Sequence, residues 1–63
     1  MTYQEILNAG GELVSEEVVD QNVDGGYWNI YAQVYRIPDG REFDVECQGA
    51  DLGDIREEHE VMK

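Results

Sequence analysis

Carboxylates are the side chains that dominate the chemistry of this sequence. Fifteen Asp and Glu residues stand against four Lys and Arg, and the formal net charge is −11 at pH 7. Glu42, Asp44 and Glu46 occupy alternate positions, which would place them on one face of a β-strand about 6.8 Å apart. That spacing is comparable with the distance between successive phosphates along a nucleic-acid strand. The charge favours a basic protein surface as the partner, and it excludes direct binding to DNA or RNA, which needs many basic residues.

The residues that usually carry catalysis are too few and too scattered for an enzyme. Nucleophilic catalysis needs a serine or cysteine beside a base and an orienting acid. Here Ser15, Cys47 and His59 fall on three separate expected elements. A zinc site would need several Cys or His, and the chain has no glycine-rich phosphate loop followed by lysine. We therefore expect no enzymatic activity, no catalytic residue, no metal site and no cofactor.

One loop matches the first half of an EF-hand calcium site. Its sequence runs Asp-Gln-Asn-Val-Asp-Gly from Asp20 to Gly25. A complete loop closes on a bidentate glutamate at its twelfth position, but the twelfth residue counted from Asp20 is Tyr31. We interpret the segment as a polar hairpin turn and leave weak calcium binding there open.

The element that would position the carboxylates is a β-hairpin between Tyr27 and Gln48. Apolar and polar residues alternate at period two on both sides of a turn at 38–40. The apolar positions are Trp28, Ile30, Ala32 and Val34 before the turn and Phe43, Val45 and Cys47 after it. We expect these to face the core, with Tyr27, Tyr31 and Tyr35 on the outer face beside the acidic residues.

The register of this hairpin depends on two competing effects. Pro38-Asp39-Gly40 suits a three-residue loop, which would place Val34 opposite Asp44 and the two apolar sets on opposite faces. A two- or four-residue connection would place Val34 beside Val45. Turn preferences are worth about 1 kcal/mol, whereas burying one Val or Phe side chain is worth about 1.5–3 kcal/mol. We expect the register that gathers the apolar residues, unless a bulge or a second cover reverses it.

The flanking segments predict two short helices and one more strand. Thr2 and Glu5 form a capping box for a helix that ends at Gly10. Residues 12–21 predict an edge strand with a bulge, a short helix being the alternative. Residues 55–62 predict a short docked helix, with His59 as a partly buried spacer, or a frayed tail. The expected fold is one α+β domain over 1–63, with a three-stranded antiparallel meander between the helices.

Composition limits the remaining properties. Cys47 is the lone cysteine, so it should be a small buried side chain, and its isolation fits a reducing cytoplasm. No apolar run is long enough for a signal peptide or a membrane span. A chain this short has a marginal core, and self-association could supply further stability.

In size, charge and layout the chain resembles the small anti-CRISPR and DNA-mimic inhibitors encoded by phages and mobile elements. The resemblance implies an inhibitor that acts in the host cytoplasm and occupies a basic nucleic-acid-binding surface. The alternative is a small adaptor or assembly module, homodimeric through its tyrosines or its edge strand, whose acidity serves solubility. The expected partner-binding residues are Tyr27, Tyr31, Tyr35, Glu42, Asp44, Glu46, Asp51, Asp54, Glu57 and Glu58.

Overall fold

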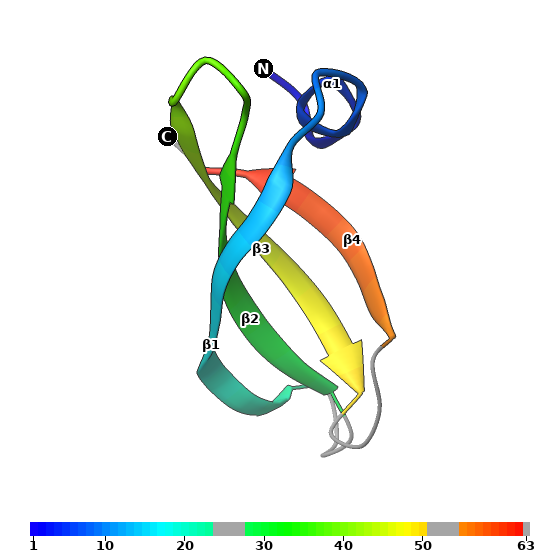
Figure 1. Ribbon diagram of the computed structural model, residues 1–63. Coiled ribbons are helices and arrows are strands. Elements are labelled where there is room, and N and C mark those ends of the chain that lie inside the picture. Colours follow the sequence, from blue (N-terminus) through cyan, green and yellow to red (C-terminus); the bar gives the residue numbers. More distant parts are fainter. Residues whose placement is uncertain (24–27, 51–54, 63) are drawn as a thin grey trace.

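One short helix precedes a four-stranded antiparallel sheet in the computed structural model, which describes residues 1–23, 28–50 and 55–62 (Figure 1). The elements are α1 (Tyr3–Asn8), β1 (Glu12–Val23), β2 (Trp28–Arg36), β3 (Glu42–Ala50) and β4 (Arg56–Val61). Each strand pairs with the next along the chain. The α+β class, the N-terminal helix and the antiparallel meander are confirmed. In the described part of the chain, no helix is long and apolar enough to cross a membrane.

The expected capping box starts α1. The Thr2 hydroxyl accepts a hydrogen bond from the Glu5 backbone N–H at 3.2 Å, and the Glu5 carboxylate accepts one from the Thr2 N–H at 2.8 Å. These bonds, led by the one from the Thr2 backbone, lower the pKa of Glu5. Six residues are too few for a stable isolated helix. The helix is held through Ile6, whose side chain is fully buried.

The C-terminal segment is a fourth strand. The prediction of three strands followed by a helix or a frayed tail was therefore wrong. β4 pairs with β3 from Gly49–Arg56 to Val45–Val61, and the Met62 N–H donates to the Asp44 carbonyl at 2.7 Å. Pairing satisfies backbone groups that would otherwise be exposed along the edge of β3. A helix would instead have placed Glu58 and Glu60 near its negative end. Glu58 has a positive φ of 56° at the one irregularity of this pairing.

The hairpin register is the one set by the turn, so the prediction of Val34 beside Val45 was wrong. The Ile37 N–H donates to the Arg41 carbonyl at 3.0 Å, and the Gly40 N–H donates to the Ile37 carbonyl at 2.9 Å. Gly40 has a φ of 97°, which glycine adopts without strain. This three-residue loop places Val34 opposite Asp44.

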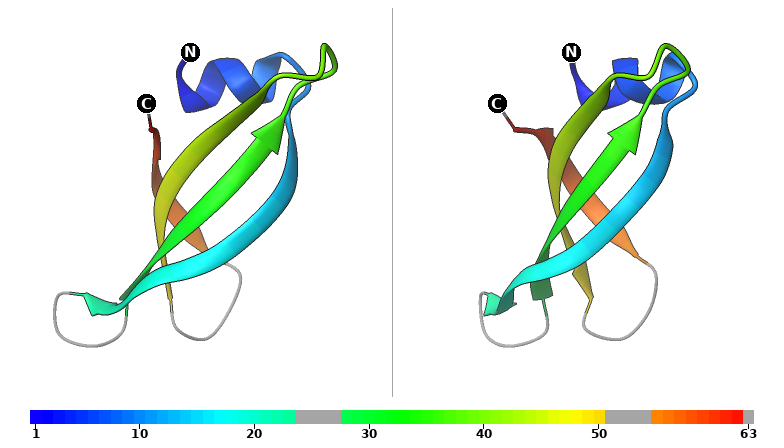
Figure 2. Two further views of the ribbon diagram at one scale, coloured as in Figure 1. Left: turned by 90° about the vertical axis from the view of Figure 1, so that its left-hand side faces the viewer. Right: turned by 60° about the vertical axis from the view of Figure 1, so that its left-hand side comes forward.

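The turn prevails because this register gathers large apolar side chains on one covered face of the sheet. The sheet is strongly twisted and curled, and α1 lies at the end that also holds the β2–β3 turn (Figure 2). We call the covered face the inner face. Its core consists of Ile6, Tyr35, Ile37 and Val45, with Tyr3, Phe43 and Val61 packed against it. Tyrosine buries a large apolar ring, so the tyrosine-bearing face of β2 can form a core. Cys47 is buried there as expected, with 2% of its surface exposed.

β1 is the edge strand that the sequence predicted, and it contains bulges. Its pairing with β2 shifts register between Leu13 and Ser15, between Val18 and Asp20, and again beyond Asp20. Three irregularities bend and twist the strand. They account for the paired apolar residues of the sequence: Val14 and Val19 each lie within such a shift, and both are exposed.

Candidate interaction surface

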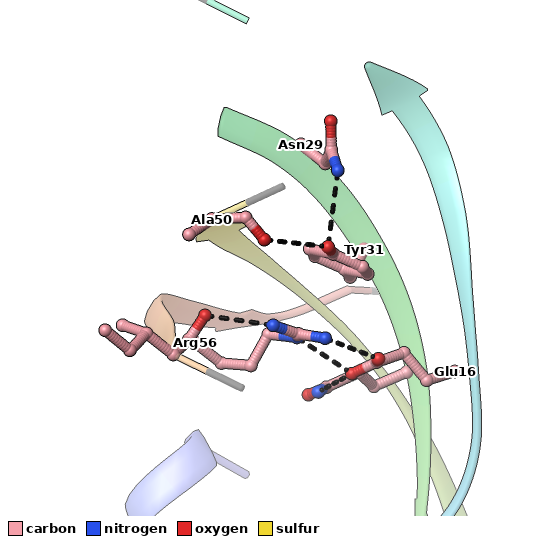
Figure 3. Close-up of polar contacts among 7 residues, drawn as sticks. Glu16, Asn29, Tyr31, Ala50 and Arg56 are labelled. Carbon is pink, nitrogen blue, oxygen red and sulfur yellow. Dashed lines mark hydrogen bonds and ion pairs between the residues drawn. The ribbon is translucent and has the colours of Figure 1, made fainter. Parts of the chain in front are cut away.

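An ion pair joins the two edge strands, β1 and β4, across the inner face of the curled sheet. Arg56 of β4 donates from Nη2 to Glu16 Oε1 at 2.9 Å and from Nε to Glu16 Oε2 at 3.1 Å, although the two residues are 40 positions apart (Figure 3). The Arg56 guanidinium also lies 3.8 Å from the centre of the Tyr31 ring. Gln33, which is 3% exposed, donates to Glu16 Oε2 at 2.7 Å. These contacts connect β1, β2 and β4 by side chains alone.

The ion pair changes the protonation of both partners. Hydrogen bonds from Arg56 are the main reason that the pKa of Glu16 is lowered, and the same bonds raise the pKa of Arg56. Gly49 leaves the space that the cluster needs. A Cβ atom at Gly49 would lie 2.7 Å from the Tyr31 ring and 2.8 Å from Arg56 Nη1. These contacts hold β1 and β4 together across the inner face, and we call the ion pair of Glu16 and Arg56 the lock.

The opposite side of the sheet, which we call the outer face, presents carboxylates in rows that run across the strands. Residues directly opposite each other in an antiparallel pair share a face. Ala32 is opposite Glu17 on β1 and Glu46 on β3, and Glu46 is in turn opposite Glu60 on β4. The row on one side holds Ser15, Val34, Asp44 and Met62, and the row on the other side holds Asp20, Ile30, Gln48 and Glu57.

An apolar stripe runs through these rows along β2. Trp28, Ile30, Ala32 and Val34 are half-buried, although α1 packs against the other face of the sheet. Carboxylates flank this stripe on β1 and on β3. Ala32 and Val34 of the stripe, together with the residues flanking them, line an open groove of about 550 Å³. Its outer-face lining is Ser15, Glu17, Ala32, Val34, Asp44, Glu46 and Met62.

Among the described arginines, Arg36 lies on the outer face at the end near the β2–β3 turn, directly opposite Glu42. The ion pairs join Arg36 to Glu42, Arg41 to Asp39 and Arg56 to Glu16. Within the described ranges, Glu17, Asp44, Glu46 and Glu60 therefore have no cationic partner. Glu46 and Glu60 face each other directly, and like charges in that arrangement are destabilising. Away from the Arg36–Glu42 pair, the outer face thus carries a concentration of carboxylates that none of the described cations neutralises.

The expected partner-binding residues are separated by the fold. Tyr31 and Tyr35 are buried on the inner face, 6% and 7% exposed, so their assignment to an outer contact surface was wrong. The Tyr31 hydroxyl donates to the Ala50 carbonyl at 3.2 Å, and burial raises the pKa of Tyr35. Tyr27, Asp51 and Asp54 lie outside the described residues, as do Asp24 and Gly25 of the segment considered for calcium. Among the described residues, no cluster of three or more His, Cys, Asp or Glu could hold a metal ion.

The expected carboxylates do gather, together with residues that the sequence assigned elsewhere. Glu42, Asp44 and Glu46 lie on the outer face, and β4 adds Glu57 beside them. Glu58 lines a further pocket with Glu46 and Glu60. Missing from the prediction were Glu17, Glu60 and the apolar stripe, because the stripe was assigned to the core and the tail to a helix. The polar alternation of Ser15 and Glu17 was the available sign of the β1 flank.

Comparisons with protein-family models, with curated proteins and with solved structures find no match to this chain.

Proposed function

We propose that this protein is a non-enzymatic inhibitor whose outer face binds the basic nucleic-acid-binding surface of another protein. The target is a nucleic-acid-handling protein, such as a host defence complex, and the inhibitor excludes nucleic acid from it. The observation that carries the proposal is the row formed by Glu17, Glu46 and Glu60 around Ala32. Carboxylates repeat there both along and across the strands, in an array that a basic surface would neutralise.

The cost of this array to the free protein supports a binding role. Directly opposed Glu46 and Glu60 repel each other, and the described arginines pair with other carboxylates. Solubility alone requires a net charge, but it does not require the charges to face each other on one side of a sheet. A basic partner relieves the repulsion when it binds.

The apolar stripe supplies the contact that the tyrosines were expected to supply. Long-range charge increases the association rate, whereas desolvated apolar contacts mainly decrease the dissociation rate. Ile30 and Val34 lie among the carboxylates, so both contributions come from one surface. A second copy of this chain would present the same carboxylates, so two outer faces would repel each other.

The test compares two variants of equal net charge. In the first variant, Asp44→Asn, Glu46→Gln and Glu60→Gln remove three charges from the outer face. In the control, Gln4→Lys, Leu7→Lys and Asn8→Lys add three positive charges to α1, where these side chains are exposed. Both changes move the formal charge from −11 to −8 (−11 + 3). Replacing Glu57, Glu58 and Glu60 by lysine would not be a valid control. These residues belong to β4, which shares the outer face with β3.

The native protein and both variants are immobilised and exposed to a lysate of cells that carry defence systems. The native protein and the α1 variant should capture the same proteins, a short DNA duplex should release them, and the outer-face variant should capture none. Equal capture by the two variants would show that only overall charge matters. Capture that DNA does not reverse would contradict competition with nucleic acid.

A further inference from the structure

The outer face has the dimensions of a binding site for an α-helix. The stripe on β2 lies between carboxylates on β1 and β3, with Glu17 on one side of Ala32 and Glu46 on the other. Neighbouring strands are about 4.8 Å apart, so the two carboxylate-bearing strands are separated by about 9.6 Å. That separation is close to the diameter of an α-helix with its side chains, about 10–12 Å.

The floor of the groove leaves room for such an element. Ala32 is the small residue at the centre of the groove, Ser15 is small at one edge, and Val34 is the neighbouring apolar contact. Larger side chains at these positions would fill the groove. An apolar side chain from a partner could therefore rest on Ala32 and Val34, while cations on its two sides reach Glu17 and Glu46.

Strand addition at the sheet edges fits less well. An added strand needs a regular edge of free N–H and C=O groups. The pairing of β1 with β2 shifts register three times, and β4 contains one irregularity at Glu58, which has a positive φ. Bulges of this kind interrupt an edge. Of the elements a basic protein offers, a helix matches this face best.

We infer that the occupant of the outer face is an amphipathic α-helix of the target protein, with an apolar stripe flanked on both sides by Lys or Arg. The helix lies along β2 between the carboxylates of β1 and β3. This inference rests on the proposed function, since it specifies which part of the basic target is recognised. It assigns the apolar side of that helix to Ala32 and Val34.

Two synthetic peptides of one composition test the inference. Each has about 18 residues, long enough to follow the stripe as a helix. The first arranges leucines and lysines at helical period with lysines on both flanks, and the second alternates them at period two. Trp28, the single tryptophan, lies at one end of the stripe and reports binding by its fluorescence.

The helix-patterned peptide should bind about tenfold more tightly than the alternating one, a difference of about 1.4 kcal/mol. It should also shift the Trp28 emission to shorter wavelength. Equal affinities of the two peptides would overturn the inference.

The Ala32→Glu variant distinguishes packing of a helix on the groove floor from attraction by charge alone. It adds a negative charge but fills the floor of the groove, so it should weaken binding of the helix-patterned peptide. Ser15→Glu adds the same charge at the rim and should leave the affinity unchanged or increase it. Circular dichroism and urea titration establish that both variants fold. A gain in affinity for Ala32→Glu would show that charge alone governs binding. Val34→Thr tests the apolar stripe independently. An unchanged affinity of Val34→Thr for the helix-patterned peptide would count against the helix.

The outer-face variant with Asp44→Asn, Glu46→Gln and Glu60→Gln distinguishes the two levels of the proposal. If it loses both peptides equally, while the native protein does not discriminate between them, the acidic surface stands and the helix inference fails. If it binds both peptides as the native protein does, the outer face is not the site, and the proposed function fails with it.

Discussion

At the scale of single residues, the lock between Glu16 and Arg56 joins the two edge strands across the inner face. The side chains of Arg56 and Glu16 are only 17% and 26% exposed, whereas those of Arg41 and Asp39 are 62% and 50% exposed. Partial burial strengthens an ion pair relative to one in open solvent. The two pairs therefore offer a comparison inside one small protein.

We expect Arg56→Met and Glu16→Gln to show a coupling free energy of about 1–2 kcal/mol in a double-mutant cycle, because both changes disrupt one partly buried pair. The same cycle with Arg41→Met and Asp39→Asn should give less than about 0.5 kcal/mol. Urea unfolding at neutral pH measures both. Equal couplings for the two pairs would show that the lock contributes no more than a surface contact.

The sign of the pH dependence of this lock follows from the lowered pKa of Glu16. Because the folded-state pKa lies below the unfolded one, the stabilisation is present above the unfolded pKa. It is lost as the pH falls through the folded pKa. The Glu16 contribution therefore disappears only under acidic conditions, well below neutral pH.

At the scale of elements, α1 depends on β4 for its place. The rings of Tyr3 and His59 are stacked, with centroids 3.9 Å apart and an interplanar angle of 5°. Burial, with a smaller effect of Arg56, lowers the pKa of His59. His59 is partly buried as expected, but it lies on a strand and acts as the platform for α1.

We expect the contribution of His59 to native stability to fall as the pH is lowered from about 7.5 through the ordinary histidine pKa of about 6.5, because protonating His59 is less favourable in the folded state. Its contribution is complete above the unfolded pKa and is lost as the pH falls through the lowered folded pKa. His59→Phe keeps the stacked ring and removes the titration, so its melting temperature should depend less on pH over this interval. Parallel curves for the two proteins would show that His59 does not contribute.

The pairing of β3 with β4 carries an electrostatic penalty that a substitution can remove. Glu60 lies opposite Glu46, whereas Glu57 lies opposite Gln48. Glu60→Thr should stabilise the free protein by about 0.5–1 kcal/mol, because it removes a like-charge pair and introduces a β-branched residue. Glu57→Thr is the matched control and should give a smaller gain.

Binding should change in the opposite direction. Glu60→Thr should bind the helix-patterned basic peptide more weakly than the native protein does, because one carboxylate of the outer face is lost. Denaturant titration and Trp28 fluorescence measure the two effects on the same sample. If Glu60→Thr is less stable than the native protein, the opposed carboxylates do not repel significantly in the folded state.

At the scale of the whole molecule, a net charge of −11 acts on folding and on binding with opposite dependence on salt. Like charges repel most strongly in the folded protein, where they are close together, and added salt screens them. Salt also screens the attraction between the outer face and a basic partner.

Raising NaCl from about 20 mM to about 300 mM should therefore stabilise the free protein by about 1 kcal/mol while weakening its binding to the basic peptide. Thermal unfolding and fluorescence titration at both salt concentrations measure the two effects. Potassium sulfate is avoided, because sulfate also strengthens apolar burial. A loss of stability on adding NaCl would indicate that attractive ion pairs dominate over repulsion.

The sequence by itself determined the local structure and the sign of the charge. The capping box at Thr2, the bulged edge strand β1 and the burial of Cys47 all follow from short-range patterns, and the structure confirms them. The acidic residues of β3 followed from alternation in the same way. These features depend on neighbours along the chain, so one sequence suffices to predict them.

Only the tertiary structure decided which face of the hairpin became the core. Alternation divides a strand into two faces, but it does not say which face is covered when both contain large side chains. The curl of the sheet and the docking of α1 covered the face with Tyr31 and Tyr35, and this allowed the turn at Gly40 to set the register. The C-terminal segment became β4 because the edge of β3 needed a partner, a requirement that arises from residues distant in sequence. The apolar stripe was left among carboxylates for the same reason: long-range pairing, and not local pattern, assigns strands to neighbours and faces to solvent.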